Sequence, residues 1–483
     1  MKKLKNNIRE KLGNDFFELL DHGKNYVTAD ILAKGLAFIS IPIFTRLLTP
    51  EEYGVLAVFN SFVAVFVVVF GLGVRGAVGR YFYDDKTDFK EYFGSSFTFI
   101  LIWSVFLSIL LSIFNNYLSN FFNLSETLIY IGILVAFFSS TFEILQSYLE
   151  ASKQSKLFSK LNIIRSISIL CCSIPITYFL NNNREYGQVI GQLLVYFSFF
   201  VFSTHSILKI SKAGFKKKHI KFSLLFGIPL VFHLLSQFVL ATFDQIIISQ
   251  LVGEKETGLY SFAYQIGMIQ NIIAMAILRA WTPVFYEKLN AKLFSDIDSL
   301  IKKYSKMIYM LAFVLIIFSK ELVVLLADIR YSSSLEIVPI VIISYVLYFF
   351  YVIYVGYSFY HKKTYLIAIF TVLAGIINIS LNYIFIPKYG YQVAAVTTLI
   401  SYLFLFCFHY LNSKFIIKTE KIIQLKTLLP NFLLLVLTVF MFFWIKRFLE
   451  NYLLILIIKI VLLSLITVIM YKNIIFQKKY NGK

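Results

Sequence analysis

Long apolar runs recur along the whole chain and constrain its fold more than any other feature. Roughly fourteen runs of about 18 or more residues are each long enough to cross about 30 Å of hydrocarbon as a helix. The run from Val63 to Phe70 is continuously apolar, whereas a membrane β-strand would alternate apolar and polar residues. The sequence therefore predicts an all-α polytopic membrane protein with about fourteen transmembrane helices.

The composition excludes an ordinary water-soluble enzyme. Apolar residues make up 59% of the 483 residues and charged residues only 15%, against roughly 45–50% and 25% in soluble domains. So much apolar surface cannot be hidden in cores of ordinary size, and lipid must cover the rest. Cys171, Cys172 and Cys407 lie in apolar runs without CxxC spacing, which predicts neither a disulfide framework nor a metal site.

Lysines and arginines gather in alternate loops. The formal net charge is +20, and about 34 of the 46 basic residues fall in one set of loops and near both chain ends. Cytoplasmic loops collect basic residues, so both termini are predicted to be cytoplasmic, and no nucleic-acid partner is needed to explain the charge. Near the N-terminus Leu4, Ile8, Leu12 and Phe16 recur every four residues, which predicts an interfacial amphipathic helix rather than a signal peptide.

The chain repeats itself once. Gly54 and Gly258 occupy matching hairpin segments 204 positions apart, and Gly187 and Gly390, each preceded by tyrosine, are 203 positions apart. The alternative is that glycine after an acidic turn is generic hairpin chemistry. Two similar offsets favour two six-span halves of parallel topology, a common transporter plan with its site between the halves. The predicted organisation is an amphipathic cytoplasmic segment (1–25), a lobe of spans 1–6 (26–210), a lobe of spans 7–12 (221–411) and a C-terminal helix pair (428–471).

One motif imitates a nucleotide site. Gly71-Leu72-Gly73-Val74-Arg75-Gly76 spells GxGxxG, and Glu91 follows about 20 residues later. The motif lies within or beside a membrane-length run, from Tyr53 to Val78, and no βαβ unit fits around it. Dinucleotide binding is therefore not expected, and the chain has no ATPase, metalloprotease or serine hydrolase motif.

Several segments resemble one known family. They are Ile41 to Gly54 (IPIFTRLLTPEEYG), Gly71-Leu72-Gly73, Arg80-Tyr81-Phe82, Asp244 to Ile248 (DQIII) and Gly258-Leu259-Tyr260. In these segments, and in its spans and repeat, the chain resembles the Wzx-type polysaccharide-export flippases of the multidrug/oligosaccharidyl-lipid/polysaccharide (MOP) exporter superfamily. The resemblance implies a flippase that moves a polyprenyl-diphosphate-linked oligosaccharide from the inner to the outer leaflet of a bacterial plasma membrane. It also implies membrane lipids and polysaccharide polymerase machinery as partners, and it does not specify the sugar.

Basic side chains inside the predicted spans are candidates for binding the diphosphate. Lys34, Arg75, Arg165 and Arg279 all fall in the predicted cytoplasmic half, on different helices. Arginine can donate two hydrogen bonds to phosphate oxygens and lysine supplies a compact charge, so we expect a cationic cavity there. The alternative is that these side chains snorkel to the lipid headgroups. Arg46, near the outer end of the first span, is expected to assist outward passage or to lie at the interface.

Acidic and neutral polar residues in the spans are the second set of candidates. Asp30 and Glu143 are placed to neutralise Lys34 and Arg165 or to take part in ion coupling.

His233, Gln237 and Asp244 fall on one face of the seventh span, which predicts a cavity-facing surface able to bind H⁺ or Na⁺. Capping of a bend near Pro229 is the alternative. Gln265 aligns with Arg279 on the eighth span and is expected to contact substrate.

The sequence thus predicts a transporter that works by alternating access, without a cofactor other than a coupling ion. A multidrug or cation antiporter of the same superfamily is an alternative, favoured by Asp30, Glu143 and Asp244 and disfavoured by the buried cations. A membrane glycosyltransferase or polymerase is a further alternative, but every predicted outer loop is short. A purely structural scaffold is disfavoured by intramembrane charge on several helices.

Overall fold

The computed structural model describes residues 32–84, 88–449 and 451–480, and these residues form helices and no strands. In the first half they are a helix over residues 32–47, α3 (Pro50–Gly71), α4 (Val74–Asp84), α5 (Phe89–Ile113), α6 (Asn115–Phe122), α7 (Glu126–Ala151), α8 (Ser155–Phe179), α9 (Glu185–Ile210) and α10 (Lys217–Leu251). In the second they are α11 (Glu254–Asn290), α12 (Phe294–Ile317), α13 (Ser319–Leu326), η1 (Ile329–Glu336), α14 (Val338–Tyr360), α15 (Thr364–Tyr389), α16 (Gln392–Leu411), η2 (Asn412–Ile416), η3 (Leu425–Thr427), α17 (Leu429–Phe448) and α18 (Tyr452–Tyr480).

The prediction of an all-α polytopic membrane protein is confirmed. Twelve helices of the described chain are long and apolar enough to span a membrane, or thirteen if α12 and α13, bent by 67°, form one broken span. The expected first span, 26–47, starts outside the described residues and is helical over its described part. The predicted amphipathic segment 1–25 also lies outside the described residues.

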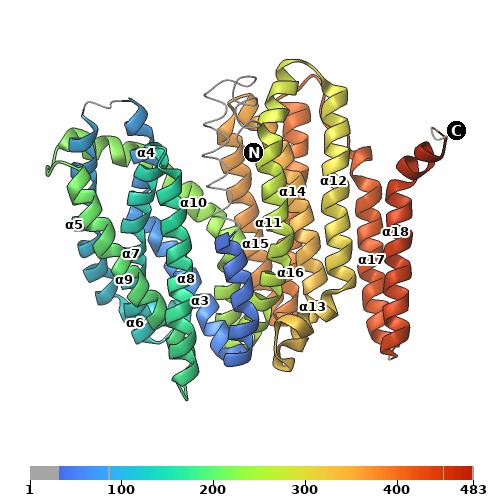
Figure 1. Ribbon diagram of the computed structural model, residues 1–483, viewed down its shortest axis with the longest axis horizontal. Coiled ribbons are helices and arrows are strands. Elements are labelled where there is room, and N and C mark those ends of the chain that lie inside the picture. Colours follow the sequence, from blue (N-terminus) through green and yellow to red (C-terminus); the bar gives the residue numbers. More distant parts are fainter. Residues whose placement is uncertain (1–31, 85–87, 450, 481–483) are drawn as a thin grey trace, which may run out of the picture. The chain divides into compact units, whose positions relative to one another are not determined.

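The described chain forms two compact units that divide between Gly258 and Leu259. Within each unit the helices run side by side (Figure 1). In the first unit α7 packs against α3, α4, α5 and α9, and 72% of its most apolar stretch is buried. In the second unit α14 has the same central place, packed against α12 and α16 with 72% buried. Each unit is therefore built around one enclosed helix, and the predicted lobe boundaries stay a prediction.

The hairpin motif that carries much of the family resemblance is a helix start. Thr49 caps α3, because its hydroxyl accepts a hydrogen bond from the Glu52 amide at 3.2 Å while the Glu52 carboxylate accepts one from the Thr49 amide at 2.8 Å. Pro50 follows at the first helical position, where a missing N–H costs nothing. Two turns of the repeat also meet here, since a Cβ on Gly54 would lie 1.9 Å from the Glu254 carbonyl oxygen and one on Gly258 would lie 1.8 Å from that of Pro50. Only glycine permits this contact between the two helix starts.

The GxGxxG segment is a helix break rather than a nucleotide loop. α3 ends at Leu72, whose φ of 45° is left-handed, and Gly73 follows with φ 66°. A Cβ on Gly73 would lie 2.4 Å from the Gly227 carbonyl oxygen of α10, so the break packs directly against that helix. The sequence predicted one span from Tyr53 to Val78, and α3 and α4 together do form one candidate span, Pro50–Asp84. The turn inside it was not predicted, and Arg75 lies in the first turn of α4 just after it.

A polar cluster joins the start of α5 to the start of α10. Asp88 contacts Lys218 at 2.5 Å and His219 Nε2 at 2.9 Å, and Nδ1 of the buried His219 lies 3.3 Å from the Ser95 hydroxyl. The hydrogen bonds from Lys218 and His219 hold the pKa of the Asp88 carboxyl well below its usual range. This cluster anchors the first turn of α10 at the end of the membrane-spanning region.

Within the second unit, the C-terminal helices α17 and α18 both pack against α12. Lys459 of α18 is 4% exposed and contacts both carboxylate oxygens of Glu321 on α13, each at 2.7 Å. The deeply buried ammonium group of Lys459 is tolerated because the Glu321 carboxylate contacts it through both of its oxygens. The bend between α12 and α13 is what brings Glu321 to α18.

Candidate functional site

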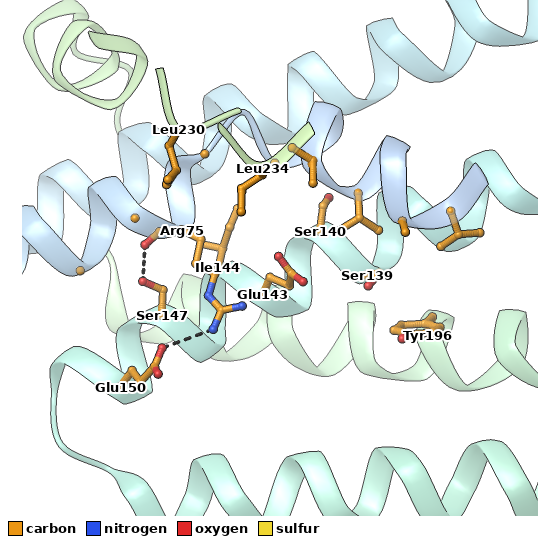
Figure 2. Close-up of a pocket in the computed structure, with 18 of the residues that line it drawn as sticks. Arg75, Ser139, Ser140, Glu143, Ile144, Ser147, Glu150, Tyr196, Leu230 and Leu234 are labelled. Carbon is orange, nitrogen blue, oxygen red and sulfur yellow. Dashed lines mark hydrogen bonds and ion pairs between the residues drawn. The ribbon is translucent and has the colours of Figure 1, made fainter. Parts of the chain in front are cut away.

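The first unit contains a cavity of about 930 Å³ that opens among α3, α4, α7, α8, α9 and α10. Its apolar walls come from α3 and from Leu230 and Leu234 of α10 (Figure 2). Its polar side chains are Asn60, Arg75, Tyr83, Ser139, Ser140, Glu143, Ser147, Glu150, Arg165, Gln192 and Tyr196. Apolar walls with a few converging polar groups are the usual composition of a small-molecule site.

Arg75 is held at one end of the cavity by α7. Its backbone carbonyl accepts a hydrogen bond from the Ser147 hydroxyl, and its guanidinium lies 3.4 Å from the Glu150 carboxylate (Figure 2). The two charged side chains are 44% and 47% exposed, so this ion pair is open to exchange with solvent or with a ligand. Tyr83, whose hydroxyl donates to the Ala151 carbonyl at 2.9 Å, lies at the same end.

Glu143 projects into the cavity about 12 Å along α7 from its last residue, Ala151. Figure 2 shows its carboxylate directed to the same space as the guanidinium of Arg75. It interacts electrostatically with both Arg75 and Arg165. The lining therefore carries two positive and two negative side chains, and its formal charges balance.

Arg165 is the more deeply set of the two arginines, ten residues or about 15 Å along α8 from Ser155. Its guanidinium carbon lies 5.3 Å from the ring centre of Phe142 and 5.8 Å from that of Tyr196. Within the described chain no carboxylate lies within ion-pair distance of it, and its buried Nε has no hydrogen-bond partner. Aromatic faces thus hold a guanidinium whose donors are left for something else to satisfy.

Neutral polar groups from three helices add donors and acceptors to the lining. Gln192 Nε2 donates to Asn60 Oδ1 at 3.2 Å, linking α9 to α3, and Ser139, Ser140 and Tyr196 line the same cavity. Amides and hydroxyls bind sugars or other neutral polar groups by hydrogen bonds, whereas the arginines bind anions. The cavity therefore combines an ionic set and a neutral set of polar groups.

The structure gathers three of the predicted residues, Arg75, Glu143 and Arg165, around this cavity. Lys34 is half-buried and Arg46 is exposed on the helix over residues 32–47, and neither lines it. Arg46 instead donates a hydrogen bond to the Pro42 carbonyl at 2.8 Å. A role for either stays a prediction.

The predicted face of α10 is uneven where it is described. Asp244 is 2% exposed and Gln237 is exposed, and Leu230 and Leu234, not these two residues, line the cavity. His233 lies in the helix, but its side chain is outside the described part of the structure, as is the whole of Asp30. The predicted ion-coupling roles stay predictions.

Gln265 and Arg279 belong to the second unit. Both lie on α11, where Gln265 is half-buried and Arg279 is exposed. Their predicted contact with substrate stays a prediction.

The sequence did not single out Glu150, Asn60 or Gln192. Glu150 ends a predicted span, so it read as an interface residue, and its partner Arg75 is 75 positions away. Asn60 and Gln192 were open to detection, because an amide inside an apolar run must find a polar partner in the membrane. What a single sequence could not provide is which amides meet.

Several solved structures resemble this fold, among them the following two. The chain superposes on "Lipid II flippase MurJ, inward closed conformation" with a TM-score of 0.72 and 18% identity, covering 93% of this chain and 99% of that one. It superposes on an inward-facing multidrug resistance MATE family transporter of the MOP superfamily with a TM-score of 0.66 and 15% identity, covering 80% and 96%. The chain is thus a multi-pass membrane protein with the fold of the MOP superfamily.

The family follows from sequence. Residues 23–289 match the model of the family described as "Polysaccharide biosynthesis protein", and the chain belongs to that family. Residues 229–384 also match the model described as MatE. A Haemophilus influenzae relative, "Lsg locus putative protein 1", is 24% identical over 366 residues, covering 74% of this chain and 88% of the relative. The family resemblance read from the sequence is confirmed.

Proposed function

We propose that this protein is a flippase that moves a polyprenyl-diphosphate-linked oligosaccharide from the inner to the outer leaflet of a bacterial plasma membrane. The diphosphate and sugars enter the cavity of the first unit while the polyprenyl tail stays in lipid. Alternating access then exposes the sugars on the other side, without a chemical change in the substrate. Both chain termini are proposed to be cytoplasmic, and a polysaccharide polymerase is proposed to receive the product.

The observation that carries this proposal is the state of Arg165. Its guanidinium lies within the membrane-spanning region, no carboxylate of the described chain is at ion-pair distance, and its buried Nε has no hydrogen-bond partner. A buried cation in this state costs free energy unless an anion binds it. A diphosphate supplies several oxygen acceptors for its forked donors. Arg75 offers a second guanidinium in the same cavity.

Glu143 and Glu150 supply a means of release. Because the formal charges that line the cavity balance, a diphosphate must compete with carboxylates for the arginines. Protonation of Glu143, or Na⁺ bound there, would favour substrate, and loss of that cation would favour departure. The coupling ion of the proposed cycle is accordingly H⁺ or Na⁺ at this carboxylate.

A multidrug or cation antiporter is the second candidate, and two observations favour it. Residues 229–384 match the MatE family model, and Glu143 and Glu150 place two carboxylates in the cavity. A cationic substrate would pair with these carboxylates but would meet Arg165 in the same space. We rank this candidate second for that reason.

Leaflet-selective quenching in proteoliposomes tests the proposal. The purified protein is reconstituted with a fluorescent polyprenyl-diphosphate oligosaccharide, and the fraction of label accessible to a membrane-impermeant quencher is followed with time. Protein-dependent movement that is lost in Arg165→Ala supports the flippase. Absence of movement, together with export of a cationic dye from the same vesicles, would establish the antiporter instead.

A further inference from the structure

Five tyrosines gather inside the second unit, and none of them was among the candidate site residues of the sequence. They are Tyr264 on α11, Tyr345, Tyr348 and Tyr351 on α14, and Tyr402 on α16, and we call them the tyrosine cluster. Ring centres are 6.3 Å apart for Tyr264 and Tyr345, 5.1 Å for Tyr348 and Tyr351, and 5.7 Å for Tyr348 and Tyr402. Three helices therefore contribute rings to one continuous surface.

The depth of these rings sets them apart from an interfacial belt. Tyr264, Tyr348 and Tyr402 each lie ten residues past the first residue of their helix, which is about 15 Å along it and about half the thickness of the hydrocarbon core. Tyrosines that anchor a protein in a membrane gather at the two interfaces, where the hydroxyl meets water. At the midplane a phenol hydroxyl needs another reason to be present.

The hydroxyl groups converge but are not fully satisfied. The ring contacts bring Tyr345, Tyr348, Tyr351 and Tyr402 together, and the Tyr348 hydroxyl donates to the Met275 sulfur at 3.6 Å. In the described chain no hydrogen-bond partner is present for the hydroxyls of Tyr345 and Tyr402. These two hydroxyls are therefore available to donate to a ligand or accept from it.

His409 adds a buried polar group beside the cluster. Its ring lies 5.9 Å from that of Tyr351 at an angle of 26°, and the side chain is fully buried. Neither ring nitrogen has a hydrogen-bond partner in the described structure. The sequences of α14, α15 and α16 contain no Asp or Glu, so no carboxylate on these helices competes for a bound ligand. The chemistry of this region suits a neutral ligand with many hydroxyl groups.

A cavity of about 290 Å³ lies between α11 and α14, and its lining on α14 begins at Val352, one turn beyond Tyr348; the five tyrosines do not line it themselves. On α14 its residues Val352, Val355 and Phe359 extend the series begun by Tyr345 and Tyr348 at steps of three and four, so they share a face. The opposite wall is α11, with the stacked rings of Trp281 and Phe285 5.1 Å apart. The cluster and the cavity therefore follow one another along the same face of α14, and the cavity is large enough for a ring-sized group.

We propose that the tyrosine cluster and this adjoining cavity form a binding site for the sugar rings of the transported molecule, an inference that rests on the proposed flippase function. The weakly polar C–H faces of a pyranose pack on the aromatic rings, and its hydroxyls exchange hydrogen bonds with Tyr345, Tyr348 and Tyr402. A site that hydrogen-bonds substrate hydroxyls rejects analogues that lack them, so this site distinguishes glycans where the arginine cavity distinguishes charge.

The test compares two lipids on the detergent-purified full chain. One is undecaprenyl diphosphate without sugar, and the other is the lipid-linked oligosaccharide extracted from the cells that carry this chain. The variant replaces Tyr345, Tyr348 and Tyr402 with phenylalanine, which removes hydroxyls and keeps the packing volume. We expect its affinity for the glycosylated lipid to fall by about tenfold or more, and its affinity for undecaprenyl diphosphate to stay within about twofold.

Two further variants keep the result interpretable. Tyr354→Phe is the matched control, since this α14 hydroxyl donates to the Ile423 carbonyl at 2.9 Å and serves the fold; it should not change the ratio of the two affinities. Tyr402→Phe alone removes a hydroxyl on which no described contact of the fold depends, and it should weaken only the glycosylated lipid, by about threefold. This single variant replaces the triple one if that does not fold.

Selective loss of the glycosylated lipid supports the sugar site. Equal loss of both lipids, or no loss, overturns it and leaves the flippase proposal standing on the arginine cavity. A wild-type protein that binds neither lipid overturns the sugar site and the proposed function together.

Discussion

The two membrane-embedded sites differ in the kind of polar group that they enclose. The cavity of the first unit contains two arginines and two glutamates, whereas the tyrosine cluster and its adjoining cavity in the second contain no Asp, Glu, Lys or Arg. The predicted repeat pairs Gly54 with Gly258, and each of these glycines lies against the helix start of the other. The two sites, by contrast, differ in their enclosed charge, because only the first contains Arg or Glu side chains.

The difference has a physical consequence for how each site can bind. Ionic groups act over several ångströms and favour any anion of suitable size, since the energy depends mainly on charge and distance. Aromatic rings and hydroxyls act at contact and depend on shape and on hydroxyl positions. A transporter with both kinds of site would recruit by charge and select by contact, and the two contributions should separate under mutation.

The largest expected effect is on Arg165. Arg165→Ala should reduce translocation of a polyprenyl-diphosphate lipid by about 10- to 100-fold, because a hydrogen-bonded charge pair contributes about 1.5–3 kcal/mol. Arg165→Lys should retain part of the activity, since it keeps the charge and loses the forked geometry. Proteoliposome flipping with leaflet-selective quenching measures both.

The matched control is Arg80→Ala. Arg80 also lies on the cavity-forming helix α4, but it is exposed, pairs with Asp84 at 3.0 Å and does not line the cavity. Its loss should leave translocation unchanged. Equal loss in Arg80→Ala and Arg165→Ala would mean that general positive charge, rather than the cavity, determines transport.

Arg279 tests the contrast between an ionic site in the first unit and an uncharged site in the second. If Arg279 binds substrate, the second unit also contributes a cation. Arg279→Ala is expected to lower translocation by about tenfold, and Arg279→Lys to retain part of it. An Ala variant that inserts normally and transports fully would remove Arg279 from the site. The ionic role would then belong to the first unit alone.

Much of the fold follows from the sequence because apolar length and period are local properties. The helical spans, the basic loops and the repeat glycines were all readable from residues near one another in the chain. The turns that interrupt helices could not be read from neighbouring residues in this way. The turn at Leu72 and Gly73 interrupts a run that stays apolar, and it packs closely against Gly227, more than 150 positions away.

The candidate site was predicted in part for the same reason. Arg75, Glu143 and Arg165 stand out as charges in apolar runs, and burial of charge is costly wherever it occurs. The tyrosines gave no such signal, since 32 of them are spread along a chain rich in aromatics and most need no explanation beyond lipid contact. Only the packing of α11, α14 and α16 brings five of them together.

A smaller change should sharpen the account of the ionic cavity. Glu150→Gln removes the carboxylate that competes for Arg75 at 3.4 Å, so affinity for undecaprenyl diphosphate should rise by about two- to fivefold. Glu126→Gln, an exposed position at the other end of α7, is the control and should change nothing. Binding titration of the two variants in detergent decides this, and a fall in affinity for Glu150→Gln would mean that the carboxylate orients Arg75 instead.

The smallest effect is expected for Asp88, whose charge lies outside both sites. Asp88→Asn removes the negative charge that Lys218 and His219 contact and should lower the thermal midpoint in detergent at pH 7 by no more than a few degrees, with translocation unchanged. Because the folded-state pKa of Asp88 is depressed, its ionised form stabilises the fold above the unfolded-state value of about 4, and this contribution disappears as the pH falls toward the folded-state pKa. The difference between wild type and variant should therefore shrink below about pH 4. A transport defect in Asp88→Asn at pH 7 would instead make the α5–α10 junction part of the transport machinery, and the contrast between enclosed and peripheral charge would fail.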